Sequence, residues 1–506
     1  MEVAIPPDSL LRRAVCSWLA VTAGGTLWGF LASAPVPLSM RLATVAVLLL
    51  AAFRPERAVL IVAALAPIGG PIGALWRSPQ AWTEPLVLAL LAGWLAQRAI
   101  LDRRADPAAD GTAVLLAVVA LASVAVQAAQ RAGATGSYLE ATGWLARNFV
   151  GQALPGFPGG RAALPLLAGA GLFALAADLG QRHRTTLPAL ARMLVVAGAA
   201  VAAFSVNRLI EVSLRRPDAW AALVDFLGWY RIAAVFPDVN AVGAFFLLLM
   251  PLAIDPLYRR SDRLLGLVAL PLLLAGLWLA GSRTALLLAP VAVVAVVLLK
   301  TVGGREWKRA GLLLGSLAAL TLLIVASYPR SGAHGAALTA VEIRADMARA
   351  ALGMARDAPV FGVGIGQFQR RSPRYMPERV RQQYRSENAH NQFLQILGEL
   401  GIAGLGAFLG LLACGLLPAL SLPSGPRAHT PWLPGLAAGL IAFLVVSVSM
   451  HPLLIMEVSF VFWLTLGVCR ATARSVQGGA PEGRSGGRVT MMLAALVVAL
   501  VPRRAS

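Results

Sequence analysis

The chain has 506 residues, of which 58% are hydrophobic and only 13% charged, and its formal net charge is +20 at pH 7. A soluble domain does not need so much apolar material, and many apolar runs reach about 20 residues, the length that spans a bilayer. The composition excludes a soluble enzyme and predicts an all-α polytopic membrane protein. Nucleic-acid binding is not indicated, because the basic residues are spread between the apolar runs.

About fourteen transmembrane helices are predicted. In chain order they are 14–34, 38–53, 58–76, 84–100, 111–130, 161–180, 193–212, 233–256, 264–282, 284–299, 310–327, 391–418, 433–451 and 453–469. A large loop separates the eleventh span from the twelfth. A fifteenth run, Val489–Val501, is short for a span, which predicts an interfacial helix or a tail.

The distribution of Lys and Arg predicts the orientation. With the N-terminus in the cytoplasm, the inner connections hold 22 basic residues and the short outer connections hold three. The first apolar run has no convincing cleavage site, so we expect it to be retained. Three longer segments then lie outside, at about 131–161, 208–232 and 328–391.

The outer segment 328–391 carries ten Arg residues against five acidic residues. An external basic surface suits an anionic substrate, and attraction to anionic headgroups is the alternative. Val341–Arg356 has helical spacing, with Ile343, Met347, Ala350, Ala351 and Met354 on one side. The glycines of Phe361–Gly366 predict a tight turn that returns the segment toward the membrane, because no strand–helix unit surrounds them.

A polar cluster, Ser386 to Asn391, runs directly into an apolar helix. Ser386 or Asn388 is expected to cap that helix. His390 then lies in or just before the first turn, where the positive end of the helix dipole disfavours imidazolium. A neutral, proton-accepting imidazole is predicted there, and the same helix end suits a phosphate group.

Two arginines are predicted to reach the same outer face as His390. Arg231 lies just before the eighth span, and Arg283 lies in a tight reversal between the ninth and tenth spans. The planar guanidinium matches phosphate oxygens and keeps its charge, so two arginines and a neutral histidine suit a departing pyrophosphate and an attacking hydroxyl. The alternatives are a pair of Arg231 with Asp225 or Asp238, an Arg283 that reaches the headgroups, and a His390 that only caps a helix.

Three groups of motifs stand out in the second half of the chain. The first comprises Pro359–Phe368, Asn388–Leu394 and Glu399–Gly404, the second is Gly281–Ala285, and a weaker third joins Arg231 to Phe236–Asn240. Together they resemble the motifs of the O-antigen ligase and polymerase superfamily. The resemblance covers about residues 225–470. It separates N-terminal transmembrane helices (1–224) from a ligase-like core (225–470, with the periplasmic loop 328–391) and a cytoplasmic tail (471–506).

The resemblance implies a GT-C-like membrane glycosyltransferase in the bacterial inner membrane, with a periplasmic active site. Such enzymes transfer a glycan from an undecaprenyl pyrophosphate carrier to a sugar hydroxyl without a cofactor or, in the ligases, a metal. By this resemblance Arg231 and Arg283 would hold the pyrophosphate and His390 would be the base or the group that orients the acceptor. We expect Asn388, Asn391, Tyr384 and Arg385 to contact substrate. His451, at an outer span end, is a second candidate, and Glu399 and Glu457 could hold an arginine.

The leading hypothesis is a ligase that joins a polymer to a lipid A–core acceptor. The alternative is an O-antigen or exopolysaccharide polymerase, followed by a protein O-oligosaccharyltransferase. Membrane lipids are partners in every case. A transporter or a scaffold protein is the competing class, but the sequence has no internal repeat and its functional charge gathers at one face.

Overall fold

The computed structural model describes residues 7–32, 36–78, 81–101, 107–137, 159–229, 231–232, 235–300, 333–383 and 387–477. These residues form helices joined by short connections and contain no strand. The helices are α1 (Pro7–Ala32), α2 (Leu38–Phe53), α3 (Pro55–Leu65), η1 (Ala66–Ile68), α4 (Gly69–Leu75), α5 (Thr83–Leu101), α6 (Pro107–Thr135), α8 (Gly159–Arg182), α9 (Thr186–Leu214), α10 (Ala219–Trp229), α11 (Val239–Ile254), η2 (Asp255–Tyr258), α12 (Arg263–Ala280), α13 (Arg283–Lys300), α15 (Ala333–Asp357), α16 (Phe368–Arg371), η3 (Ser372–Arg374), α17 (Glu378–Gln383), α18 (Gln392–Leu420), α19 (Ser424–His429), α20 (Leu433–Val446), η4 (Pro452–Leu454) and α21 (Met456–Gln477).

The polytopic membrane architecture agrees with the sequence prediction. Among the described residues, eleven helices are long and apolar enough to cross a membrane, and two shorter apolar helices, α2 and α20, accompany them. These thirteen helices fall where the sequence predicts spans. The remaining predicted span, 310–327, and the run Val489–Val501 lie outside the described residues. In the predicted outer segment 208–232, α9 continues to Leu214 and the separate helix α10 follows.

The central helix of the bundle is α11, whose residues from Ala241 to Ile254 are all buried. It packs closely against α20 at two glycines one helical turn apart. A Cβ atom on Gly439 would lie 2.1 Å from the Leu248 carbonyl oxygen, and one on Gly435 would lie 2.7 Å from that of Pro251. Small residues at this spacing let two helix backbones approach, which is the usual way that membrane helices pack.

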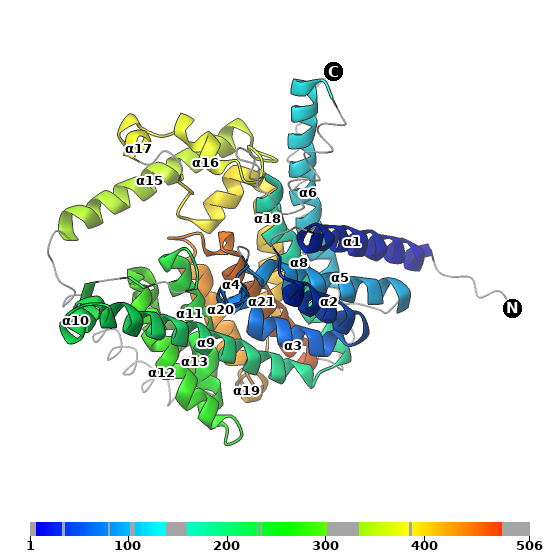
Figure 1. The fold of residues 1–506 in the computed structure, drawn as a ribbon. Coiled ribbons are helices and arrows are strands. Elements are labelled where there is room, and N and C mark those ends of the chain that lie inside the picture. Colours follow the sequence, from blue (N-terminus) through cyan, green and yellow to red (C-terminus); the bar gives the residue numbers. More distant parts are fainter. Residues whose placement is uncertain are drawn as a thin grey trace.

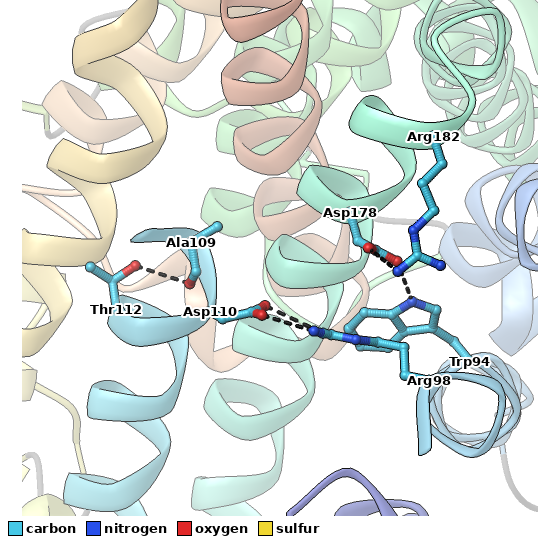
Figure 2. Close-up of polar contacts among 7 residues, drawn as sticks. All are labelled: Trp94, Arg98, Ala109, Asp110, Thr112, Asp178 and Arg182. Carbon is cyan, nitrogen blue, oxygen red and sulfur yellow. Dashed lines mark hydrogen bonds and ion pairs between the residues drawn. The ribbon is translucent and has the colours of Figure 1, made fainter. Parts of the chain in front are cut away.

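Charged residues at the end of the bundle that the sequence places in the cytoplasm are paired. The carboxylate of Asp178 in α8 accepts from Trp94 Nε1 at 3.0 Å and pairs with Arg182 at 2.6 Å. Figure 2 shows the neighbouring Arg98, whose guanidinium lies 5.0 Å from the Trp94 ring and meets Asp110 at 2.8 Å. These contacts join α5, α6 and α8, and they balance two cations with two carboxylates.

A second pairing at the same end joins α11, α13 and α20. The fully buried carboxylate of Asp255 contacts Arg259 at 2.9 Å and Lys300 at 2.5 Å, and it accepts from the Trp432 amide at 3.0 Å. A carboxylate buried in this way needs such partners, because an unpaired buried charge is strongly unfavourable. The ends of three helices that are predicted to be cytoplasmic are therefore tied to one side chain.

An outer helical segment, α15 to α17, lies at the opposite end of the molecule (Figure 1). The predicted apolar side of α15 is confirmed. Met347 and Ala350 form one buried cluster with Met376 and Val380, and Ile343 packs against it. The remaining two residues of that side, Ala351 and Met354, join a second cluster that includes Phe368 and Ala389. The second cluster brings this segment against the residues next to His390.

Candidate active site

His390 immediately precedes the N-terminal end of α18, as predicted. Its backbone is left-handed, with φ of 49°, a conformation that costs a non-glycine residue on the order of 1 kcal/mol. Hydrogen bonds on both sides hold it: the Ala389 amide donates to Gln395 Oε1 at 2.9 Å, and the Gln392 amide donates to the Ser447 carbonyl at 2.9 Å. The chain therefore fixes the direction of the imidazole before any substrate binds.

The predicted helix cap is wrong. Asn391 caps α18, because its Oδ1 accepts from the amides of Phe393 at 2.9 Å and Leu394 at 3.0 Å. Asn388 Oδ1 instead accepts from Gln395 Nε2 at 3.3 Å. Ser386 lies outside the described residues. A one-turn sequence pattern could not choose between three neighbouring polar side chains, since each of them can cap a helix.

Charged side chains and a second histidine lie beside His390. Its Nε2 lies 3.6 Å from Glu387 Oε2, and its ring centroid lies 5.1 Å from that of His451. Burial lowers the pKa of His390, the Glu387 and Asp238 carboxylates raise it, and the Arg344 guanidinium lowers it; the net direction is downward. His390 is therefore neutral at pH 7, and burial is the largest cause.

Asp238 connects the histidines to the first turn of α11. Its Oδ1 caps that helix by accepting from the amides of Asn240 at 2.7 Å and Ala241 at 3.4 Å. The same carboxylate is close enough to raise the pKa of both His390 and His451. The beginnings of α11 and α18 and the connection after α20 thus meet at one end of the bundle.

The predicted arginines lie together at the turn between α12 and α13. Arg231 Nη2 donates to the Gly281 carbonyl at 2.8 Å, and the next amide, of Ile232, donates to the Leu279 carbonyl at 2.8 Å. Gly281 ends α12 in the left-handed conformation, and a Cβ atom there would lie 2.9 Å from Arg231 Cγ. Arg283 follows two residues later as the first residue of α13, and both arginines are exposed.

This arginine turn also adjoins the beginning of α11. A Cβ atom on Gly243 would lie 2.5 Å from Ser282 Cβ, so α11 and the turn are in close contact one residue before Arg283. Asp238 lies at the cap of the same helix, within range of the histidines. Segments separated by more than a hundred residues in the sequence therefore gather around the first turns of α11.

Of the remaining predicted substrate contacts, Tyr384 and Arg385 lie outside the described residues. Asn388 and Asn391 flank His390, and the side-chain oxygens of both accept hydrogen bonds from the first turns of α18. Their structural work is to fix the segment that carries His390. Any contact of these two residues with substrate remains a prediction.

The predicted glycine turn fills a break in α18. At Gly401 the helix is interrupted, with φ of 64° and ψ of −162°, whereas the sequence suggests one continuous span. The amides of Val363 and Gly364 donate to the carbonyls of Gly398 and Glu399, and the amides of Ile402 and Ala403 donate to the carbonyls of Pro359 and Val360. The turn thus satisfies backbone groups that the break would leave unpaired inside the membrane.

Polar residues of α6 hold the other side of this turn. Ile365 donates through its amide to Ser123 Oγ at 2.9 Å and accepts through its carbonyl from Gln127 Nε2 at 3.1 Å. Gln367 Nε2 donates to Gln127 Oε1 at 2.8 Å. Because no strand or phosphate-binding helix end takes part in these described contacts, the turn is a structural element, as the sequence predicts.

The expectation that Glu399 and Glu457 hold an arginine is wrong for the contacts seen. Glu399 Oε1 accepts from the Phe368 amide at 3.1 Å and from Gln395 Nε2 at 2.9 Å. Glu457 Oε1 accepts from Thr83 Oγ1 at 3.3 Å. Both carboxylates are satisfied by neutral donors, and Glu399 links the glycine turn to the Gln395 side chain that holds Ala389.

A cavity of about 290 Å³ lies between α8, α18 and the beginning of α21. Aliphatic side chains form most of its wall, and Gln392, Gln395 and Glu399 form the polar part. Gln392 Oε1 also accepts from the Leu453 amide at 3.1 Å. The polar wall of the cavity therefore consists of the side chains that fasten the His390 segment to α18 and η4.

The outer helical segment keeps an excess of positive charge. Asp346 pairs with Arg349 at 2.5 Å and with Arg379 at 3.1 Å, and Arg381 pairs with Glu378. In contrast, the described arginines 344, 356, 371 and 374 have no carboxylate partner within the described part of the chain. Arg344 is the one whose charge acts on His390.

The all-helical architecture, with its eleven long apolar helices among the described residues, defines a multi-pass membrane protein. Residues 268–409 match the family model described as O-antigen ligase, which agrees with the superfamily that the motifs indicate. No functionally curated protein matches the chain. The family match supports glycan transfer of the ligase or polymerase type and includes Arg283 and His390, but it ends before His451 and begins after Arg231.

Sequence patterns missed three contributors to this site. Glu387 and Arg344 looked like ordinary loop charges, and Gln395 looked like one polar residue in an apolar helix. Gln395 carried the best available signal, because a glutamine in the first turn of a membrane helix needs hydrogen-bond partners. Its partners, Asn388, Ala389 and Glu399, are near it in the sequence, but only the fold shows that they contact it.

Proposed function

We propose that this protein transfers a glycan from an undecaprenyl pyrophosphate carrier to a sugar hydroxyl at the periplasmic face of the inner membrane, as an O-antigen ligase with a lipid A–core acceptor. The proposal rests on one observation: the segment that carries His390 and the α12–α13 turn, where Arg231 and Arg283 lie, both adjoin the first turns of α11. The family match over residues 268–409 supports this class of chemistry.

In this mechanism His390 is the base. The acceptor hydroxyl oxygen attacks the anomeric carbon, and the bond from that carbon to the pyrophosphate oxygen breaks. The hydroxyl proton passes to His390, and attack opposite the leaving group inverts the anomeric centre. Because Nε2 of His390 faces Glu387 at 3.6 Å, Nδ1 accepts the proton and the carboxylate stabilises the imidazolium that forms.

Arg231 and Arg283 stabilise the pyrophosphate that departs with its carrier. Guanidinium groups bind phosphate oxygens in a bidentate manner and keep their charge at every relevant pH. Both side chains are exposed at the α12–α13 turn, and the Arg231 bond to the Gly281 carbonyl directs its guanidinium toward that turn. Charge that develops on the leaving oxygen is the charge that such a pair stabilises.

The test uses the purified full-length protein in proteoliposomes with an undecaprenyl-pyrophosphate-linked oligosaccharide as donor. Rough lipopolysaccharide, which presents lipid A–core, is the acceptor in one series, and a second carrier-linked repeat is the acceptor in another. We expect His390→Ala, Arg231→Ala and Arg283→Ala each to abolish transfer, with unchanged membrane insertion, because each removes the base or a charge on the leaving group.

Two control variants match these substitutions. His429→Ala removes a histidine of α19, far from the site, and Arg208→Ala removes an exposed arginine that pairs with Glu211; both are expected to keep full transfer. Full activity in His390→Ala would contradict the base assignment. Transfer only to the second carrier-linked repeat would replace the ligase by a polymerase, and a deletion strain distinguishes them too: loss of a ligase leaves polymer on the carrier, and loss of a polymerase leaves single repeats.

A further inference from the structure

The second imidazole beside the proposed base is not explained by packing alone. His451 follows the end of α20 and immediately precedes η4. Its ring lies 5.1 Å from that of His390, with 56° between the ring planes. Among the described side chains, its Nδ1 is buried and has no hydrogen-bond partner. A buried polar atom of this kind is uncommon in a folded protein and calls for a physical reason.

The unpartnered nitrogen determines which tautomer His451 adopts. A neutral imidazole has one N–H donor and one acceptor nitrogen. An N–H buried without an acceptor is more costly than a buried lone pair. The hydrogen therefore lies on Nε2, and Nδ1 carries the lone pair.

The same reasoning keeps His451 neutral. An imidazolium would need a hydrogen on the buried Nδ1, and it would place a second positive charge beside His390. Burial, and after it the neighbouring His390, lower the pKa of His451 to about 4, against the opposing effect of Asp238 on α11. Glu387, Asp238 and, from α15, Arg344 are the charged groups that act on His390 itself. Near pH 7, His451 is thus a hydrogen-bond donor with a fixed N–H.

We propose that His451 is a second substrate-binding residue of the acceptor site, where its Nε2–H donates to the same sugar hydroxyl oxygen whose proton His390 accepts. A hydroxyl group is both a donor and an acceptor, so it satisfies one proton-accepting and one proton-donating imidazole at once. No bond changes at His451, which only holds the oxygen in line with the base. The inference depends on the proposed function, because it names the acceptor contact of that reaction.

The experiment compares three substitutions in the full-length protein in proteoliposomes. His451→Phe keeps an aromatic ring against His390 and removes the donor. His451→Gln places an amide N–H near the position of Nε2, and His451→Asn places it near that of Nδ1. Initial rates are measured against the concentration of whichever acceptor, rough lipopolysaccharide or the carrier-linked repeat, the wild-type protein uses, and separately against the donor.

We expect kcat/KM for the acceptor to fall about tenfold or more in His451→Phe and His451→Asn, the loss expected for one hydrogen bond to a substrate. His451→Gln should stay within about threefold of the wild type, and KM for the donor should not change in any variant. A purely structural role would impair His451→Gln as much as His451→Phe, or would raise KM for the donor, and either result would overturn the inference.

Normal acceptor kinetics in His451→Phe would overturn it as well. If this variant does not remain monodisperse in detergent, the contrast between His451→Gln and His451→Asn decides, because equal activities in these two contradict a donor at Nε2. Failure of the proposed function is a different result: the wild-type protein would then transfer no glycan to either acceptor, whatever residue stands at position 451.

Discussion

At the scale of the residue, His390 is governed by burial and by charges from three segments. Its side chain is 26% exposed, and burial is the largest influence on its pKa. Glu387 precedes it by three residues, Arg344 belongs to α15, and Asp238 caps α11. A base must be unprotonated to accept a proton, so in the proposed mechanism these neighbours set the lower limit of the pH range for transfer.

The acid side of the pH–rate profile should therefore move in opposite directions in two variants. Glycan transfer falls as the pH falls through the pKa of His390, which lies below its ordinary value of 6.5. Arg344→Ala removes a charge that lowers this pKa, so its acid limb should shift to higher pH. Glu387→Gln removes a charge that raises the pKa, so its acid limb should shift to lower pH.

The profiles of kcat/KM in proteoliposomes, taken with the wild type and Arg356→Ala as a control, measure these shifts. Arg356 is an exposed arginine of the same helix as Arg344 but does not act on His390. Shifts of the same sign in Arg344→Ala and Glu387→Gln would show that another group titrates.

Single-residue patterns predicted candidate side chains at this end of the bundle, but not their surroundings. The position of His390 before a helix start and the places of Arg231 and Arg283 near turns follow from local sequence patterns, whereas the neutral state of His390 comes mainly from burial. The contact of His390 with His451 and the bond from Arg231 to the Gly281 carbonyl depend on how distant segments pack, whereas Glu387 is only three residues from His390 in the sequence. The assignment of the cap to Asn388 or Ser386 failed because local chemistry permits all three polar positions.

At the scale of the element, the glycine turn and the break in α18 are one structure. Each supplies the backbone partners that the other lacks, through the bonds between Pro359–Gly364 and Gly398–Ala403. Gly362, Gly364 and Gly401 all have positive φ, a region that favours glycine. The turn therefore depends on residues without a side chain at these positions.

A methyl group at Gly364 should damage this element. Its φ is 108°, and a Cβ atom would lie 2.8 Å from Gln127 Nε2. We expect Gly364→Ala to lower the free energy of unfolding by more than about 2 kcal/mol, from backbone strain and the displaced hydrogen bonds to α6. Thermal unfolding in detergent, followed by size-exclusion chromatography, measures the loss.

Gly406→Ala is the matched control, because Gly406 lies in a regular part of α18 and a Cβ atom there would have nothing within 4 Å. Alanine is a better helix former, so this variant should be neutral or more stable by about 0.5–1 kcal/mol. Equal unfolding temperatures for Gly364→Ala and Gly406→Ala would contradict the role of the turn.

The sequence predicted the turn and its return toward the membrane, but not the partner that receives it. Apolar periodicity continues through Gly401, so the twelfth span looks uninterrupted. Glycines at 398, 401 and 404 were visible, yet such glycines also occur where helices pack closely. Only the fold shows that a second backbone occupies the space they leave.

At the scale of the whole molecule, the two ends of the bundle use charge differently. At the predicted cytoplasmic end, Asp178 and Asp255 are buried and paired with cations. At the site end, the charges of Arg344 and of the Arg231–Arg283 turn are exposed. One end is built for cohesion between helices, and the other presents positive charge where an anionic substrate can reach it.

Loss of the Asp255 carboxylate should therefore cost stability rather than chemistry. Asp255→Ala leaves Arg259, Lys300 and the Trp432 amide without their shared acceptor, and breaking a buried pair of this kind costs about 3–5 kcal/mol. The thermal unfolding midpoint should fall sharply, while the protein that remains folded keeps its transfer rate. Glu342→Ala, which removes an exposed carboxylate 3.8 Å from Arg379, should change the midpoint little, and a similar loss in both variants would contradict the argument.

The architecture was the most predictable property of this chain. Length, hydropathy and the Lys/Arg bias predicted a set of spans that alternate in direction. Helix ends that are predicted to lie on the same side of the membrane contact one another: Asp178 of α8 bonds to Trp94 of α5, and Arg98 of α5 pairs with Asp110 of α6 (Figure 2). Hydropathy and charge bias are properties of the linear sequence, so they can be used without knowing which helices pack together. The choice of neighbours, such as α11 against α20, depends on small residues whose partners the sequence does not name.

The pairing of the glycine turn with the break in α18 makes the segment between them a closed loop. This loop begins at Pro359, which is hydrogen-bonded to α18, includes the outer helices α16 and α17, and ends just after His390, where α18 begins. Both ends of this loop are anchored to α18, about two to three turns apart, so the distance between them is set by α18 and not by the length of the intervening chain. The part of the loop farthest from α18 is therefore free to vary in length, since loop closure depends only weakly on residue number. The imidazole of His390, near one end of the loop, keeps its position.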